Sequence, residues 1–104
     1  MRESTVEDHL VKRVKEMGGE VRKVQWIGRN YAPDRVVMLP RFRAFTDSVP
    51  GRTIWVELKS SEKILTFPST PRERAQHREH ERMREMGQTV VVIGTFAEVD
   101  ELLK

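Results

Sequence analysis

Residues 54 to 59, Ile54-Trp55-Val56-Glu57-Leu58-Lys59, decide the fold of this chain. Their β-branched and aromatic content predicts a buried strand, and period-2 alternation points Glu57 and Lys59 out of the same face, with Trp55 behind them. Ionisable side chains in the middle of such a strand are costly to bury unless they are paired or bound to a metal. The stretch therefore predicts a polar site built into a sheet.

A second acid, in Pro33-Asp34, opens another predicted strand. Mg²⁺ prefers carboxylate, carbonyl and water oxygens, which Asp34 and Glu57 would provide, while Lys59 would steady an attacking water or the charge developing on phosphorus. This combination is typical of phosphodiester hydrolysis. Taken alone, a Glu-x-Lys triplet is more often a surface ion pair on an edge strand, so the interpretation depends on its context.

Length and composition limit the class of protein. The 104 residues predict a single domain, 1–104, with one modest core, and 34% charged against 38% hydrophobic residues indicates a globular chain. The net charge of +3 permits a polyanionic partner without requiring one. The absence of cysteine excludes disulfides and thiolate metal sites. Without an apolar leader or a membrane-length segment, we expect a cytoplasmic protein with no membrane contact.

Hydrophobic periodicity and turn residues predict the element order α-β-β-β-α-β-α. The first helix, over roughly 5–17, carries apolar residues at helical spacing and ends at Gly18-Gly19. A strand is then predicted at 20–27, followed by a loop at 28–33 and a second strand at 35–39. A long basic hairpin connection at 40–52 leads to the third strand, at 53–59.

The second half of the chain predicts a β-α-β unit. After a polar loop at 60–70, Thr70-Pro71-Arg72-Glu73 combines an N-cap, a proline at the first helical position and a capping-box glutamate, which begins a helix over 71–86. An apolar strand at 89–94 and a closing helix at 96–103 follow. The helical crossover makes the third and fourth strands parallel, so we expect a mixed sheet with helices on its faces.

Several motifs occur in a specific order and spacing: Glu3-Ser4-Thr5-Val6-Glu7, Gly18-Gly19 with Lys23, Gly28 before Pro33-Asp34-Arg35, Val56-Glu57-Leu58-Lys59, and Gln76 followed by Met83, Gly87 and a valine-rich strand. Together they resemble the VRR-NUC family of the PD-(D/E)XK nuclease superfamily over nearly the whole chain. The resemblance implies a restriction-endonuclease-like fold and structure-selective DNA cleavage that depends on Mg²⁺ or Mn²⁺ and leaves 5′-phosphate and 3′-hydroxyl ends.

The resemblance also implies roles for particular residues. Asp34 and Glu57 match the metal-binding acids and Lys59 the catalytic lysine, and the backbone carbonyl of Leu58 is expected to complete the metal shell. Glu7 matches the glutamate of the first helix. It would bind the metal, either through a water or by holding a second ion. Gln76 matches the glutamine of the second helix.

Some of these residues have structural alternatives. Ser4-Thr5-Val6-Glu7 is itself a capping box, and Gln76 could bond to nearby backbone instead. His77 and His80 are interpreted as helix-surface residues, Met83 and Met86 as core, and Trp26 as a packing residue. The candidate DNA contacts are Arg29, Tyr31, Arg35 and Arg72.

Three questions of function stay open at this point. The connections at 40–52 and 60–70 are longer than in the compact form of the family, and they are the natural place for substrate choice. A Holliday-junction resolvase and a DNA-binding module with a vestigial site are the alternatives to a general endonuclease. We also expect a homodimer, since one domain carries one catalytic cluster. Its interface would use Ile64, Leu65 and Phe67, or Phe96, Val99, Leu102 and Leu103 of the closing helix.

Overall fold

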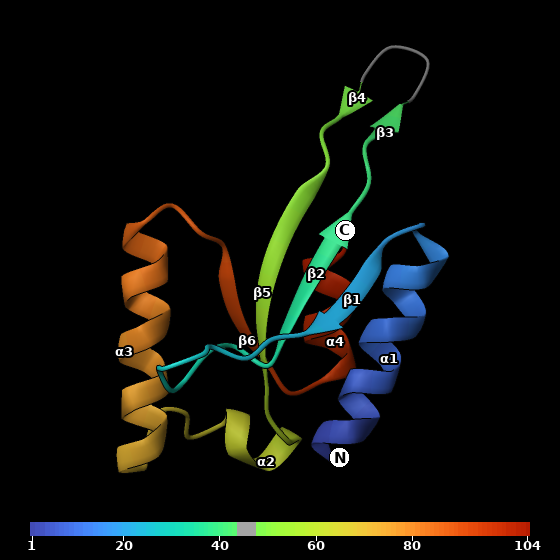
Figure 1. Ribbon diagram of the computed structural model, residues 1–104. Helices are drawn as coiled ribbons and strands as arrows, with labels where there is room; N and C mark the ends of the chain where they lie inside the picture. Colours follow the sequence, from blue (N-terminus) through green and yellow to red (C-terminus); the bar gives the residue numbers. More distant parts are fainter. Residues whose placement is uncertain (44–47) are drawn as a thin grey trace.

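The computed structural model describes residues 1–43 and 48–104 (Figure 1). Its elements are α1 (Glu3–Glu16), β1 (Glu20–Lys23), β2 (Arg35–Leu39), β3 (Phe42–Arg43), β4 (Ser48–Val49), β5 (Arg52–Leu58), α2 (Ser61–Ile64), α3 (Pro71–Glu85), β6 (Val90–Ile93) and α4 (Phe96–Leu102). The predicted order is confirmed, with two additions. The short helix α2 lies in the predicted 60–70 loop, and β3 and β4 pair within the 40–52 connection, of which 44–47 lie outside the described residues.

The main sheet has four strands in the order β1-β2-β5-β6. The first three are antiparallel neighbours, with Val37 of β2 opposite Ile54 of β5. β5 and β6 run parallel, with Glu57 opposite Val92, because α3 carries the chain back between them. This is the mixed α/β sheet expected from the β-α-β unit.

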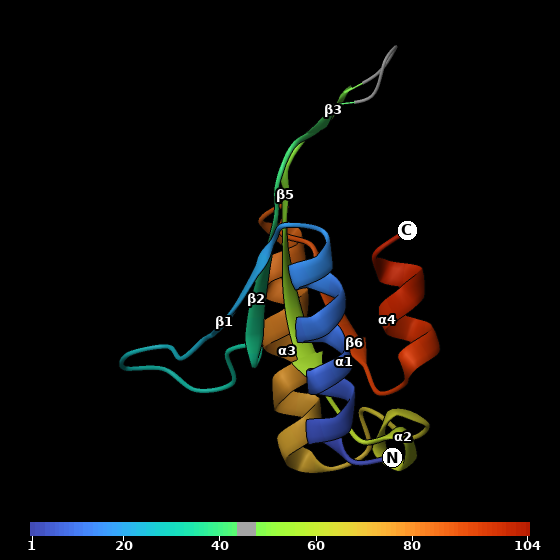
Figure 2. The same cartoon turned by 90° about the vertical axis from the view of Figure 1, so that its right-hand side faces the viewer.

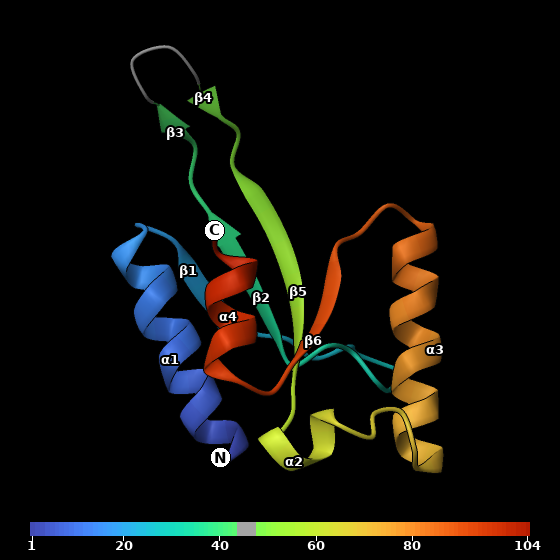
Figure 3. The same ribbon diagram turned by 180° about the vertical axis from the view of Figure 1, so that it is seen from behind.

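The two faces of β5 have different environments. Ile54, Val56 and Leu58 join the apolar core that α1 and α4 complete on one face, whose members are Val6, Leu10, Val14, Val37, Leu39, Ile54, Val56, Leu58, Ile93, Val99 and Leu103. Figure 3 shows α1 and α4 lying close together and α3 apart from them, near β6. The alternate side chains, including Glu57, face α3. The predicted alternation of this strand is confirmed.

The ends of two helices differ in how they are capped. The N-cap of α1 is Arg2, with no side-chain cap, so the helix begins two residues earlier than predicted and the capping-box interpretation of Glu7 is wrong. In α3 the capping box is confirmed: the Glu73 N–H donates to Thr70 Oγ1 (3.1 Å) and Glu73 Oε1 accepts from the Thr70 N–H (3.3 Å).

The first strand is shorter than predicted. β1 ends at Lys23, and the Val24 N–H then donates to the Asp34 carbonyl (3.0 Å), so that residues 25–33 leave the sheet as a loop closed at its neck (Figure 2). The residues assigned to the end of the strand turn instead toward α3, where Trp26 finds a polar partner. Met86 is 66% exposed, which corrects its assignment to the core, whereas Met83 is buried as predicted. No helix among the described residues combines the length and apolar character needed to cross a membrane.

Candidate active site

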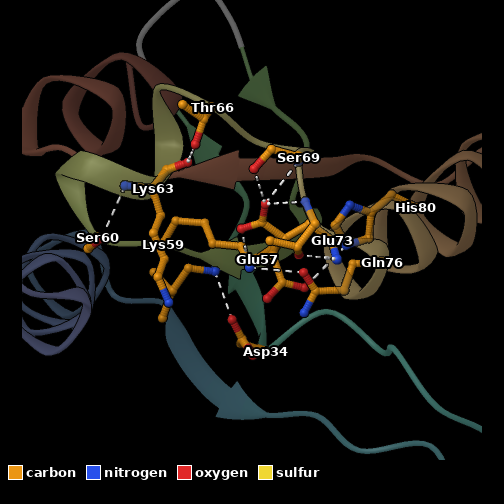
Figure 4. Close-up of polar contacts among 12 residues, drawn as sticks. Asp34, Glu57, Lys59, Ser60, Lys63, Thr66, Ser69, Glu73, Gln76 and His80 are labelled. Carbon is orange, nitrogen blue, oxygen red and sulfur yellow. Dashed lines mark hydrogen bonds and ion pairs between the residues drawn. The ribbon is translucent and has the colours of Figure 1, made fainter.

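The ends of β2 and β5 bring two acids together. Asp34 directly precedes β2, and its Oδ2 accepts a hydrogen bond from the Leu58 N–H (2.8 Å) at the end of β5 (Figure 4). The Leu58 side chain is 2% exposed and belongs to the core, so it is the backbone of Leu58 that borders the site. This contact holds the Asp34 carboxylate beside Glu57, one residue earlier in β5.

A cleft of about 400 Å³ opens at this point. It contains the acids Asp34 and Glu57, the ammonium of Lys59 and the amide of Gln76, which the sequence placed in one site. The complete lining is Glu3, Asp34, Glu57, Leu58, Lys59, Lys63, Thr66, Ser69, Thr70, Arg72, Glu73 and Gln76. The lining contains both carboxylates and cations, so the cleft suits a ligand that carries negative charge together with a positive counter-ion.

Glu57 is the most strongly perturbed acid of the cleft. It is 2% exposed, and burial raises its pKa from an ordinary 4.5 to about 9, with further contributions from a hydrogen bond with Asp34 and from the negative charge of that residue. Lys59 opposes the shift without cancelling it. With its pKa at about 9, chiefly because of burial, Glu57 carries a proton at neutral pH.

His80 lies behind Glu57, on α3. Its side chain is fully buried, which corrects its interpretation as a surface residue, and its Nε2 lies 3.2 Å from Glu57 Oε1. Burial lowers the pKa of His80 to about 4, helped by Arg84 and His77, so the imidazole is neutral. Among the described residues its Nδ1 has no partner, which favours the tautomer that donates from Nε2 to Glu57.

Lys59 is held by three neighbours. Its Nζ donates to Gln76 Oε1 (2.9 Å), lies 3.7 Å from Glu73 Oε2 and sits 5.2 Å from the centre of the Phe67 ring. These contacts fix the direction of the ammonium, and the residue as a whole is only 8% exposed. Gln76 bonds to this lysine, so its amide serves the site and not the nearby backbone.

Glu73 was not singled out as a site residue from the sequence, because its capping role accounts for it completely. The structure gives it a second role. One oxygen accepts from the backbone N–H of Ser69, the first cause of its lowered pKa, and the other faces Lys59. The N-terminus of α3 and Lys59 therefore share one carboxylate.

The acid that the first helix presents to the cleft is Glu3. Glu7, the residue matched from the sequence, is bound by the Arg35 guanidinium and does not border the cleft. Glu3 lies one helical turn earlier and does border it, and its pKa is raised by partial burial and by the charge of Asp34. Both glutamates lie near the start of α1, and the way this helix packs determines that Glu3, and not Glu7, borders the cleft.

The donor set suits a hard divalent cation. In the described part of the chain, no group of three or more His, Cys, Asp or Glu side chains is close enough to enclose an ion. Mg²⁺ does not need such a cage, because it is commonly bound by one or two carboxylates together with waters and substrate phosphates. Asp34, Glu57 and the Leu58 backbone could supply that kind of open donor set.

The four candidate DNA contacts lie in different environments. Arg29, Tyr31 and Arg72 line a second cavity, of about 830 Å³, next to the cleft. Arg35 is largely engaged, because its guanidinium also donates to the Asp34 carbonyl (2.8 Å). Arg29 is bound by Glu79 and still keeps about half of its side chain exposed. DNA contact by these residues stays a prediction.

Comparison with known proteins bears on this arrangement. Models of protein families give no match. The chain is 35% identical over 94 residues to "Putative nuclease p44" of Acyrthosiphon pisum secondary endosymbiont phage 1, over 89% of this chain and 83% of that protein. A solved structure described as a VRR_NUC domain is 36% identical and has a TM-score of 0.74, over 97% of this chain and 92% of that one. The chain belongs to the VRR-NUC family. The resemblance and the restriction-endonuclease-like fold are thereby confirmed.

The buried Glu57 of this VRR-NUC domain gives a stability prediction. Its folded-state pKa is raised, so the folded protein keeps a proton that the unfolded chain loses between pH 4.5 and about 9. Stability without metal should fall as pH rises through this window, by up to about 1.4 kcal/mol per pH unit from this group. Glu57→Gln cannot ionise, so this variant should not lose stability in this way as pH rises. In EDTA, its melting temperature should match wild type near pH 5 and exceed it increasingly toward pH 8.

Glu16→Gln is the control, since Glu16 is exposed at the end of α1. Thermal unfolding of all three proteins across pH 5 to 8 is the measurement. A difference between Glu57→Gln and wild type that does not change with pH would contradict the assignment of a buried, protonated Glu57.

Proposed function

We propose that this protein is a divalent-metal-dependent endodeoxyribonuclease that hydrolyses DNA phosphodiester bonds. The observation that carries the proposal is the meeting of Asp34, Glu57, Lys59 and Gln76 at one cleft. Membership of the VRR-NUC family supports it, as does similarity to a relative named as a nuclease. A vestigial site is less well supported, because burying Glu57 and Lys59 beside the half-buried Asp34 costs stability that a pure binding module has no need to carry.

The metal, Mg²⁺ or Mn²⁺, would be held by Asp34, Glu57 and the Leu58 carbonyl. When bound it supplies Lewis acidity and a water with a lowered pKa. Its charge would also replace the proton on Glu57. A role for Glu3 through a bridging water is compatible with its place at the edge of the cleft.

The chain's own residues perform the rest. Lys59 points into the cleft and would orient the attacking water and stabilise the charge that develops on the phosphoryl oxygens. Gln76 holds the ammonium in that direction. Glu73 helps to keep it at a fixed place between two acceptors. By analogy with similar nucleases, in-line attack would leave 5′-phosphate and 3′-hydroxyl ends.

Removing the lysine tests the site. Lys59→Ala should reduce the cleavage rate by on the order of 10²-fold or more, because stabilisation of developing charge is lost. DNA binding, measured by fluorescence anisotropy, should persist. Lys12→Ala is the matched control, because Lys12 is exposed on α1 and lines neither cavity. Near wild-type cleavage by purified Lys59→Ala would mean that another site or a contaminant cuts the DNA.

The choice of ion tests the proposed metal. Mg²⁺ and Mn²⁺ should support turnover of a labelled DNA substrate, whereas the larger Ca²⁺, with its flexible geometry, should allow binding with little cleavage. Isothermal titration should show loss of Mg²⁺ binding in Glu57→Gln. Cleavage that continues in excess EDTA would rule out the mechanism.

A homodimer would allow both strands of a junction to be cut, as a Holliday-junction resolvase requires. Val99 and Leu103 are buried in the core, so the closing helix cannot offer them to a partner, but Leu65 is 83% exposed on the loop after α2. Light scattering should give twice 12.2 kDa at micromolar concentration, and Leu65→Glu should shift the mass toward the monomer. A wild-type mass of 12.2 kDa would leave a nuclease that cuts one strand at a time.

A further inference from the structure

A second cavity adjoins the catalytic cleft, and its lining is unlike that of the cleft. It encloses about 830 Å³ and is formed mainly by the loop between β1 and β2. Asp34, Arg72 and Gln76 line both spaces, so the cavity and the cleft are continuous. A nucleotide chain whose phosphate lies against Asp34 would therefore have its next nucleotide at the mouth of this cavity.

The loop is held in place by one buried acid. Glu79 of α3 has a side chain 9% exposed, and it accepts from Trp26 Nε1 (2.9 Å) and from Arg29 Nε (3.0 Å) and Nη2 (2.6 Å). The Trp26 ring also packs at 5.8 Å from that of Trp55. Figure 1 shows the loop extending from the sheet to α3. The cavity is thus preformed, and a ligand need not order the loop.

The chemistry of the lining suits a nucleobase. Three side-chain amides can donate to and accept from base edges, two aromatic rings can stack on a base, and two guanidinium groups can face phosphate: Gln25, Asn30, Gln76, Trp26, Tyr31, Arg29 and Arg72. In the described residues, the only carboxylate of the lining is Asp34, at the junction with the cleft. The volume lies in the range of small-molecule sites, typically about 300–1,000 Å³.

Tyr31 occupies an unfavourable backbone conformation at this cavity. Its φ is 72°, in the left-handed region that bulky residues rarely adopt and that glycine or asparagine would occupy at less cost. Its side chain is nevertheless 41% exposed, so packing against the protein does not account for the choice of residue. An aromatic ring kept here at a conformational cost is suited to contact a ligand.

We propose that this cavity binds an unpaired nucleobase next to the scissile phosphate, stacked on Tyr31 and read by the amides around it. The proposal rests on the proposed nuclease function and names the DNA feature that the site selects. A base inside a continuous duplex cannot enter the cavity without leaving its partner, which costs a few kcal/mol, whereas a base at a bulge, gap or branch is already free. The protein therefore prefers DNA with an unpaired nucleotide at the cut.

The test compares two DNA duplexes that differ by one unpaired 2-aminopurine. In Ca²⁺, which suppresses cleavage, wild type should bind the bulged duplex about tenfold more tightly than the paired one, as expected for one base–aromatic stack. The 2-aminopurine fluorescence should change on binding. Tyr31→Phe keeps the ring and should retain both effects. Equal affinity for the two duplexes, or no binding of the bulged one, would overturn the proposal.

Two substitutions separate stacking from backbone strain. Tyr31→Asn removes the ring and suits the left-handed conformation, and Tyr31→Leu removes the aromatic ring while keeping bulk and strain. Both should lose the preference for the bulge, and Tyr31→Asn should melt no lower than wild type. Retained preference in Tyr31→Leu would show that aromatic stacking is not involved. Mg²⁺-dependent cleavage that Lys59→Ala abolishes, with no bulge preference in wild type, would sink this inference while leaving the nuclease function intact.

Discussion

The structure depends on two acids that the ends of adjacent strands force together inside the protein. Asp34 is half-buried and held by the backbone of Leu58, and Glu57 is buried next to it. Burial, together with the hydrogen bond and the charge of Asp34, raises the pKa of Glu57 to about 9, so this carboxylate destabilises the fold when it is ionised. The positive charge of the proposed metal would offset this cost.

The fold tolerates the cost of burying Glu57 because the two faces of β5 have different roles. Ile54, Val56 and Leu58 pack into the apolar core with α1 and α4, while the alternate positions face α3. A register shift of one residue in β5 would exchange the two sets and bury Glu57 in the apolar core. The same alternation that stabilises the sheet therefore directs the polar site, and the antiparallel pairing with β2 places Asp34 at the correct end.

Features repeated at the period of a strand or helix were predictable, and features that depend on tertiary contacts were not. The alternation of β5 and the capping box at Thr70 identified the fold, Glu57, Lys59 and the start of α3. Two glutamates four residues apart, Glu3 and Glu7, open α1, and only the docking of that helix shows that the first borders the cleft. His80 carries no pattern of burial, because the polar face of its helix is turned inward.

That inward polar face makes α3 unusual. Its buried residues are Glu73, Gln76, Glu79, His80 and Met83, so a single apolar side chain accompanies four polar ones. Each polar contact leads to a functional feature: two hold Lys59, one faces Glu57 and one anchors the loop of residues 25–33. Hydrogen bonds and ion pairs thus help to dock α3, whereas the buried residues of α1 are apolar. Because the same contacts position the lysine, the acid and the loop, a change at any one of them acts on the others through the placement of α3.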